Sequence, residues 1–134
     1  MIKTIQNDFV TLKFHDTYVI GIIHEGIDLE TEQGAEIFNL CNQFYGDKPY
    51  AIISYRLNSY SFNPFMHQEV VNQQPNLISF AIAAHSPVQR MNFAIEKMFL
   101  KVPNGFFNNL QDAIAWTQKQ VEKSPKRQAS PKSH

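Results

Sequence analysis

The chain is poor in cysteine, tryptophan and glycine, with one, one and five residues among 134, and its formal net charge is zero. The single Cys41 excludes an internal disulfide and a cysteine-rich metal knuckle. The few glycines form no phosphate-binding loop. No apolar run approaches the roughly 20 residues of a membrane-spanning helix. The start, MIKTIQNDF, lacks the features of a signal peptide, so we expect a reduced, cytoplasmic protein without a membrane span.

The charge is unevenly distributed along the chain. Residues 122–134 hold four basic residues and one acidic residue, a net charge of +3, which leaves −3 for residues 1–121. An acidic body argues against a nucleic-acid-binding protein, which would show clustered Lys and Arg. The end of the chain also has no large apolar residue to offset its ordering entropy. We therefore expect one domain over residues 1–121 and a disordered basic tail over residues 122–134.

Residues 8–25 have the pattern of a β-hairpin. The stretch DFVTLKFHD alternates in polarity, Asp16-Thr17 interrupts it, and the more apolar YVIGIIHEG follows. A two-residue loop at Asp16-Thr17 places Lys13 opposite Ile20. The second face of this hairpin is more apolar than a solvated face should be. We expect that a helix covers it or that two chains pair there as a symmetric homodimer.

Beyond the hairpin, helical and strand patterns alternate. Asp28 is a suitable N-cap for a helix that ends at Gly46, and the runs YAIISY and LISFAIAA lack the alternation of half-exposed strands. Asn63-Pro64 starts a short helix, and Ser86-Pro87 starts a longer one. The order is ββαβαβαβα, which predicts an α/β fold with a sheet that is mixed at the hairpin and parallel beyond it. The longer helix is expected to turn an apolar stripe inward, formed by Val88, Met91, Ile95, Met98 and Phe99. The segment VPNGFF is expected to form a strand with a turn at Asn104-Gly105. Asn109 is expected to cap the last helix.

Three segments in this order resemble parts of the STAS domain, the fold of bacterial anti-sigma-factor antagonists and of the cytoplasmic ends of sulfate transporters. They are His24-Glu25-Gly26, Gly46-Asp47-Lys48-Pro49-Tyr50, and the ending from Phe107 through Ala115-Trp116. The likeness is greatest to small stand-alone bacterial STAS-like proteins, mostly of unassigned function. It covers roughly residues 8–121 and implies a STAS-like mixed sheet with helices packed on it.

The resemblance also implies a regulatory serine. In antagonists of that family, a serine after the third strand is phosphorylated, and the phosphate decides whether a partner kinase binds. Ser59 and Ser61 lie in the corresponding stretch, where Asn58-Ser59-Tyr60-Ser61 replaces the family's Asp-Ser-Ser-Gly signature. The alternative interpretation is that both serines are turn and capping residues.

The residues offer no recognisable catalytic or metal-binding motif. None of the five histidines pairs with another at metal-ligand spacing, and each is assigned a structural role, including His67 in the short helix beside Glu69. Cys41 belongs to the inner stripe of the first helix, where a free thiol behaves as a small apolar group. We expect no enzyme, no cofactor and no metal.

Aromatic residues are abundant, with eleven Phe and five Tyr, and several cluster around the irregular segment after YAIISY. Such a cluster forms either core or an exposed partner or ligand site. The leading interpretation is a regulatory protein-interaction module with an unidentified protein partner. The alternative is a small-ligand or lipid-binding domain with an aromatic pocket near residues 55–66; a closed pocket on the order of a few hundred Å3 favours the ligand and a flat exposed patch favours the protein. The candidate binding residues are Arg56, Ser59, Tyr60, Ser61, Phe62 and Phe65, of which Ser59 and Ser61 are also the phosphorylation candidates.

Overall fold

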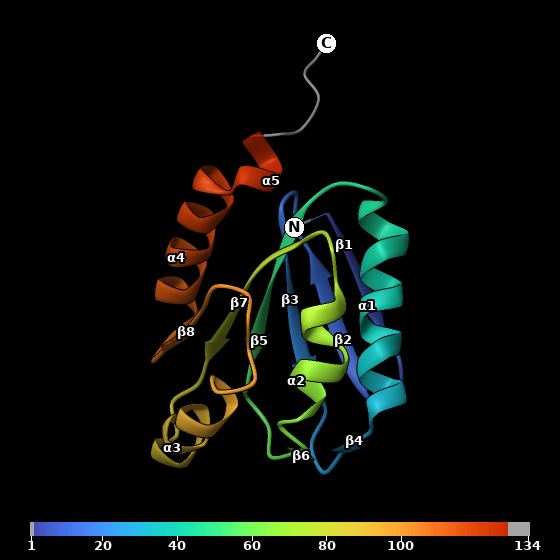
Figure 1. Ribbon diagram of the computed structural model, residues 1–134. Coiled ribbons are helices and arrows are strands. Elements are labelled where there is room, and N and C mark those ends of the chain that lie inside the picture. Colours follow the sequence, from blue (N-terminus) through green and yellow to red (C-terminus); the bar gives the residue numbers. More distant parts are fainter. Residues whose placement is uncertain (1, 129–134) are drawn as a thin grey trace.

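Alternating polarity near the start of the chain produces an antiparallel three-stranded unit. In the computed structural model, which describes residues 2–128, these strands are β1 (Lys3–Gln6), β2 (Val10–Phe14) and β3 (Tyr18–Ile23) (Figure 1). Lys13 lies opposite Ile20, so the predicted hairpin register is confirmed. The sequence did not predict β1, because its mostly exposed side chains carry no core pattern.

The apolar runs that lack alternation form the parallel half of the sheet. Strands β5 (Tyr50–Tyr55), β7 (Leu77–Ala83) and β8 (Asn104–Phe107) extend it in the order β1-β2-β3-β5-β7-β8. Every residue of β7 is buried, as expected for a central strand covered on both faces. The turn predicted at Asn104-Gly105 is wrong, since both residues pair with β7.

Helices cover both faces of the sheet. Helix α1 (Thr31–Tyr45) and helix α2 (Met66–Glu69), which continues into the 3-10 turn η1 (Val71–Gln73), lie on one face, and α4 (Leu110–Lys123) lies on the other (Figure 1). Tyr18 and Ile20, from the apolar second face of the hairpin, pack in one cluster with Ala113 and Val121 of α4. The structure thus confirms the first of the two predicted alternatives, that a helix covers the second face of the hairpin.

The segment before α1 differs from the sequence prediction. Asp28–Leu29 form the short strand β4, which pairs in parallel with β6 (Ser61–Phe62), and α1 begins only at Thr31. The N-cap is Glu30, whose backbone N–H donates to Gln33 Oε1 at 2.9 Å. The α/β class and the mixed sheet are therefore confirmed, while β1, β4 and β6 add strands to the predicted order.

Helix α3 (Pro87–Glu96) begins as predicted but presents the opposite face to the protein. Ser86 Oγ accepts hydrogen bonds from the backbone N–H groups of Val88 and Gln89, and Pro87 occupies the first turn. Glu96 is buried, however, and four of the five residues of the apolar stripe expected inside face solvent, whereas Phe99 is half-buried. The exposed fractions are 62% for Val88, 72% for Met91, 53% for Ile95 and 77% for Met98.

The end of the described chain is more ordered than the sequence indicated. Instead of a disordered tail from residue 122, α4 runs to Lys123 and a short helix, α5 (Pro125–Gln128), follows. Ser124 is buried, and Lys126 Nζ donates to the carbonyl of Leu77 at 2.8 Å. The predicted tail also includes residues 129–134, which lie outside the described residues. No helix between residues 2 and 128 is long and apolar enough to cross a membrane.

Candidate functional site

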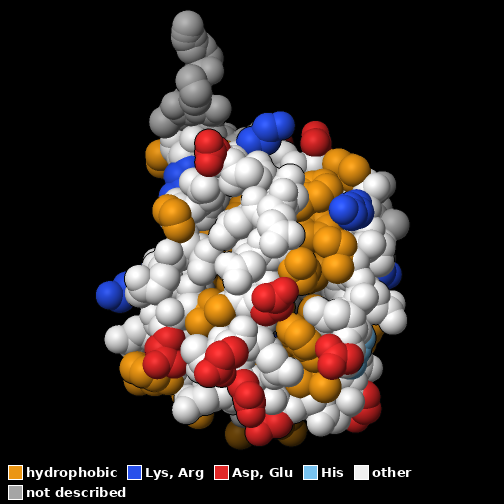
Figure 2. Space-filling view, turned by 90° about the vertical axis from the view of Figure 1, so that its right-hand side faces the viewer, with side chains coloured by type: hydrophobic (Ala, Val, Ile, Leu, Met, Phe, Trp, Pro, Cys, Tyr) orange, Lys and Arg blue, Asp and Glu red, His pale blue; other side chains and the backbone are white. Residues whose placement is uncertain are grey.

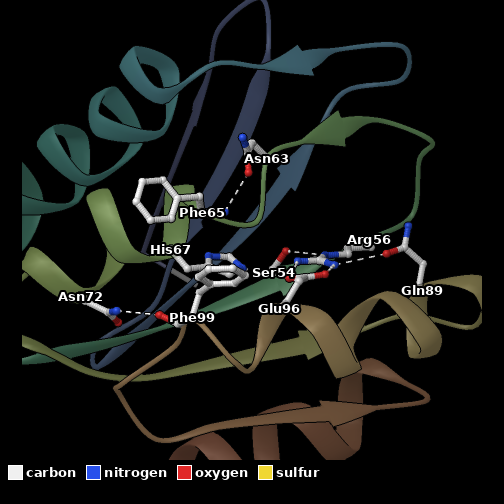
Figure 3. Close-up of polar contacts among 9 residues, drawn as sticks. All are labelled: Ser54, Arg56, Asn63, Phe65, His67, Asn72, Gln89, Glu96 and Phe99. Atoms are coloured by element: carbon white, nitrogen blue, oxygen red, sulfur yellow. Dashed lines mark hydrogen bonds and ion pairs between the residues drawn. The ribbon is translucent and has the colours of Figure 1, made fainter.

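Arg56 is the first residue after β5, at the carboxyl end of the parallel strands. Its backbone N–H donates to the carbonyl of Ala83, which continues the sheet pairing by one residue. The guanidinium turns toward α3 and forms a two-pronged ion pair with Glu96, at 2.6 Å and 2.8 Å (Figure 3). It also donates to Ser54 Oγ and Gln89 Oε1, each at 3.2 Å. The interior thus holds a full positive charge together with its counter-charge.

Glu96 is the acid at the centre of this cluster. It is 1% exposed and accepts hydrogen bonds from Arg56 and from His67 Nε2, the latter at 2.9 Å. Burial alone raises the pKa of a carboxyl group, but here the bonds from Arg56 and His67 outweigh burial and lower the pKa of Glu96. Burial likewise lowers the pKa of Arg56, and the nearby Tyr60 and Glu96 more than compensate for it. Both members of the pair are therefore charged.

His67 joins the cluster from α2. Its ring lies between Phe62 and Phe80, with centroid separations of 5.4 Å and 5.2 Å. Because Glu96 is ionised and can only accept, His67 Nε2 carries the hydrogen in their shared bond. Nδ1, the other ring nitrogen, is buried and has no hydrogen-bond partner among residues 2–128. One polar atom of the cluster is thus left open.

A cavity of about 70 Å3 lies beside this cluster, between the sheet, α1 and α2. Its polar lining residues are Ser54, Arg56, Tyr60 and His67. The remainder of the wall is apolar or glycine: Val10, Leu12, Gly21, Ile23, Leu29, Gly34, Ile37, Phe38, Ile52, Phe62, Met66, Val70, Val71 and Phe80.

Tyr60 and Phe62 separate the cavity from an outer cleft. This cleft has a volume of about 240 Å3 and lies between residues 60–64 and α3, with Gln89 and Ile95 in its wall. Tyr60 and Phe62 line both spaces, and their rings are 6.0 Å apart. The two residues form a shared aromatic wall at the carboxyl end of the sheet, where open α/β sheets bind ligands.

The structure brings three of the predicted binding residues together and leaves the other three outside. Arg56, Tyr60 and Phe62 line the cavity, whereas Ser59, Ser61 and Phe65 are exposed. Each of the two serines contacts an acidic residue. The Ser61 hydroxyl donates to Asp28 Oδ1 at 2.9 Å, and the backbone N–H of Ser59 donates to Glu25 Oε1 at 2.9 Å.

Sequence reasoning missed His67 and Glu96 as members of the site. The sequence analysis gives His67 a structural role beside Glu69, yet His67 contacts Glu96, 29 residues away. Glu96 is not among the sequence-based candidates, because a glutamate in a helix is usually solvated. A signal was present in the spacing of Gln89, Phe93 and Glu96, which share one helix face. The buried Arg56 at the end of an apolar strand also required an acid.

The remaining chemical candidates lie apart from this cluster. Cys41 is fully buried, and burial raises the pKa of its thiol to about 12, so it is an inert core group. Within the described part of the chain, no group of three His, Cys, Asp or Glu residues could hold a metal ion. Comparison with known proteins found no matching family model, curated protein or solved structure.

Proposed function

We propose that this chain is a regulatory, STAS-like protein-interaction module whose partner binds the exposed side of α3. The observation that carries the proposal is the position of the exposed apolar side chains. Among residues 2–128, every exposed large hydrophobic residue except Ile2 lies within residues 57–98. We define the α3 surface by five of them: Phe65, Val88, Met91, Ile95 and Met98.

The α3 surface is continuous with the outer cleft. Ile95 lines the cleft, and Phe65 lies near the end of α3, with its ring centroid 6.0 Å from that of Phe99. Contiguous exposed apolar patches of this kind mark interaction sites on soluble proteins. Apolar side chains of a partner would pack on the stripe and enter the cleft.

Charge indicates the chemistry of the partner. The exposed charged residues of α3 and its end, Arg90 and Lys97, are basic, because Glu96 is buried. The face formed by α1, on the other side of the molecule from α3 in Figure 1, is different, since Figure 2 shows acidic side chains gathered over its lower part. A partner segment with apolar anchors flanked by acidic residues therefore fits α3 and is repelled by the α1 face. The exposed acids at this end include Glu25, Asp28, Glu30, Glu32, Glu36 and Glu69.

The two serines provide a route for regulation. A phosphate on Ser61 would add about −1.5 to −2 charges next to Asp28, and like charges disfavour the β4–β6 pairing. A phosphate on Ser59 would lie near Glu25. Either change loosens the segment that carries Tyr60 and Phe62. Phosphorylation would thus reshape the cleft and the edge of the α3 surface.

The test replaces one exposed anchor. Met91→Glu should keep the fold, because the side chain is 72% exposed and surface changes usually stay within about 0.5 kcal/mol. It places a charge in the apolar stripe and opposes an acidic partner. Partners captured from the native host by the wild type should be lost with Met91→Glu.

The matched control is Ile2→Glu, at a residue that is 61% exposed but belongs to the opposite end of the sheet, where its backbone N–H bonds to Phe14. Specific loss with Met91→Glu and retention with Ile2→Glu supports the proposal. Equal recovery of the same proteins with both variants contradicts it. Recovery of this chain alone, with a dimer in sedimentation, would assign the α3 surface to self-association instead.

A further inference from the structure

We infer that a cleft lined by Lys101, Lys123 and Lys126, the lysine cleft, binds a small organic phosphate monoester whose apolar body packs on the cleft wall. The cleft has a volume of about 460 Å3 and lies between α5, the end of α4 and the starts of β7 and β8. Arg56 and α3 lie at the opposite end of the sheet (Figure 1). The site is therefore separate from the α3 surface and does not depend on the partner proposed there.

The three lysines give the cleft a positive charge that no nearby acid balances. All three are exposed, and within the described part of the chain none of them forms an ion pair with an acidic residue. None of the described residues that line the cleft is acidic, and Glu122, the acid nearest to Lys123 in the sequence, is not among them. The sequence after Ser124 contains no Asp or Glu. Such a cleft favours a ligand with more than one negative charge.

Lys126 provides a fixed contact for the anion. Its ammonium group donates to the carbonyl of Leu77 at 2.8 Å, which uses one of its three N–H groups. The other two can donate to a phosphate oxygen while the first holds the side chain at the cleft wall. Lys101 and Lys123 have flexible stems that can bring their ammonium groups to the same phosphate. Lysine binds phosphate as a point charge, so the site does not require the fixed geometry of arginine.

The apolar part of the wall determines the body of the ligand. Val102 is half-buried, and Pro103 and Pro125 are exposed, so each of them offers apolar surface to the cleft. Val102 also packs against the hydrophobic core, which fixes its position. Inorganic phosphate would leave this surface in water, whereas an aromatic ring would cover it. The ligand that matches both parts of the wall is a phosphate monoester with a compact aromatic or aliphatic body.

The size of the cleft admits such a molecule. At about 30 Å3 per water in the liquid, 460 Å3 corresponds to roughly fifteen waters. Phenyl phosphate has fewer non-hydrogen atoms than that, and small-molecule sites usually have volumes of roughly 300–1,000 Å3. A phosphate monoester carries about −1.5 to −2 charges at neutral pH. It therefore matches three lysines better than a carboxylate with a single charge does.

The test is an NMR titration of the full chain with phenyl phosphate, monitored at the backbone amides of Ile78, Val102 and Ser124. At about 20 mM NaCl the shifts should saturate with a Kd below roughly 10 mM, and binding should weaken at about 300 mM NaCl, where charges are screened. Three probes separate the contributions: inorganic phosphate lacks the ring, phenol lacks the phosphate, and benzoate carries a single charge. Each should bind at least about fivefold more weakly.

Two variants and a control accompany the titration. The double variant Lys101→Gln, Lys123→Gln should weaken phenyl phosphate binding at least about fivefold. The control Lys3→Gln, Lys119→Gln removes the same charge from lysines that do not line the cleft, and affinity should change less than about twofold. Val102→Thr should weaken the binding of phenyl phosphate and leave that of inorganic phosphate unchanged, because only the ring contacts this side chain.

Equal affinity for phenyl phosphate and inorganic phosphate would overturn the inference, as would an equal loss in the two lysine double variants, because either result indicates unspecific attraction to lysine. Equal affinity for phenol or benzoate, shifts confined to residues outside the cleft, or no saturable shift in the folded wild type would also overturn it. Met91→Glu changes no residue of the cleft and should bind phenyl phosphate like the wild type. Failure of this site and failure of the α3 proposal are therefore distinguishable.

Discussion

At the scale of single residues, the Arg56–Glu96 pair behaves differently from a surface ion pair. The two side chains are each 2% exposed, so both have given up hydration in the folded protein. Their mutual attraction compensates for that loss only while both are present. Removing one partner therefore leaves an uncompensated buried charge, whereas removing both leaves none.

This asymmetry gives a direct prediction. Glu96→Gln should lower the free energy of unfolding by about 3–5 kcal/mol, because Arg56 stays charged and buried. The double variant Arg56→Met, Glu96→Met should recover most of that loss. Urea denaturation of the three proteins measures the difference, with Glu36→Gln on the exposed side of α1 as control. If the Glu96→Gln protein is as stable as the control, the positive charge of Arg56 is not buried without compensation in that variant.

A second residue-scale prediction concerns the stability of the protein at acidic pH. Burial alone would raise the pKa of Glu96, but hydrogen bonds from Arg56 and His67 lower it below its ordinary value of 4.5. The ionised form therefore stabilises the fold above pH 4.5, and this contribution is lost as the pH falls through the lowered pKa of the folded state.

As the pH falls below 4.5 through the lowered pKa of Glu96, the wild type should lose more stability than Glu96→Gln, which has no carboxyl group at position 96. Thermal unfolding at several pH values measures this. Parallel curves for the two proteins would mean that other carboxyl groups govern the acid response.

At the scale of elements, α3 shows where a sequence pattern stops being decisive. The stripe Val88, Met91, Ile95 has helical spacing, but so do Gln89, Phe93 and Glu96 on the other side. Periodicity identifies the helix and its capping residue Ser86, both of which the structure confirms. Periodicity does not determine which face of the helix is buried, because the buried Arg56 requires an acidic partner and only the face with Glu96 supplies one. That need comes from a residue 40 positions earlier in the chain.

The attachment of α5 can be tested at the same scale. Lys126 Nζ donates to the carbonyl of Leu77, at the start of β7, and so joins α5 to the sheet. Lys126→Ala should lower the free energy of unfolding by about 1 kcal/mol, because the carbonyl loses its donor. Lys119→Ala, at an exposed residue of α4, is the control and should change stability by less than about 0.5 kcal/mol. Equal effects in chemical denaturation would show that the contact is not formed in solution.

At the scale of the whole molecule, the sheet was largely predictable and the site only partly so. The burial of β7, which is apolar except for Ser79, and of the alternating β2 can be read from their own residues, so the mixed sheet follows from local pattern. The aromatic segment containing Tyr60 and Phe62 was also recognisable as a site candidate. His67 and Glu96 were not, because their contact depends on the relative positions of α2 and α3 above the sheet. The residues flanking His67 and Glu96 in the sequence do not indicate that arrangement.

The Arg56–Glu96–His67 cluster also bears on the order in which the chain is made. Arg56 and His67 leave the ribosome before Glu96, since the acid follows them by 40 and 29 residues. Until Glu96 is made, Arg56 has no acid to pair with, and an unpaired cation favours hydration at the end of β5. The arrival of Glu96 then allows the end of the sheet to dehydrate. The last turn of α3 thus supplies the counter-charge of Arg56 before the core residues Leu100, Ala113 and Val121 are made.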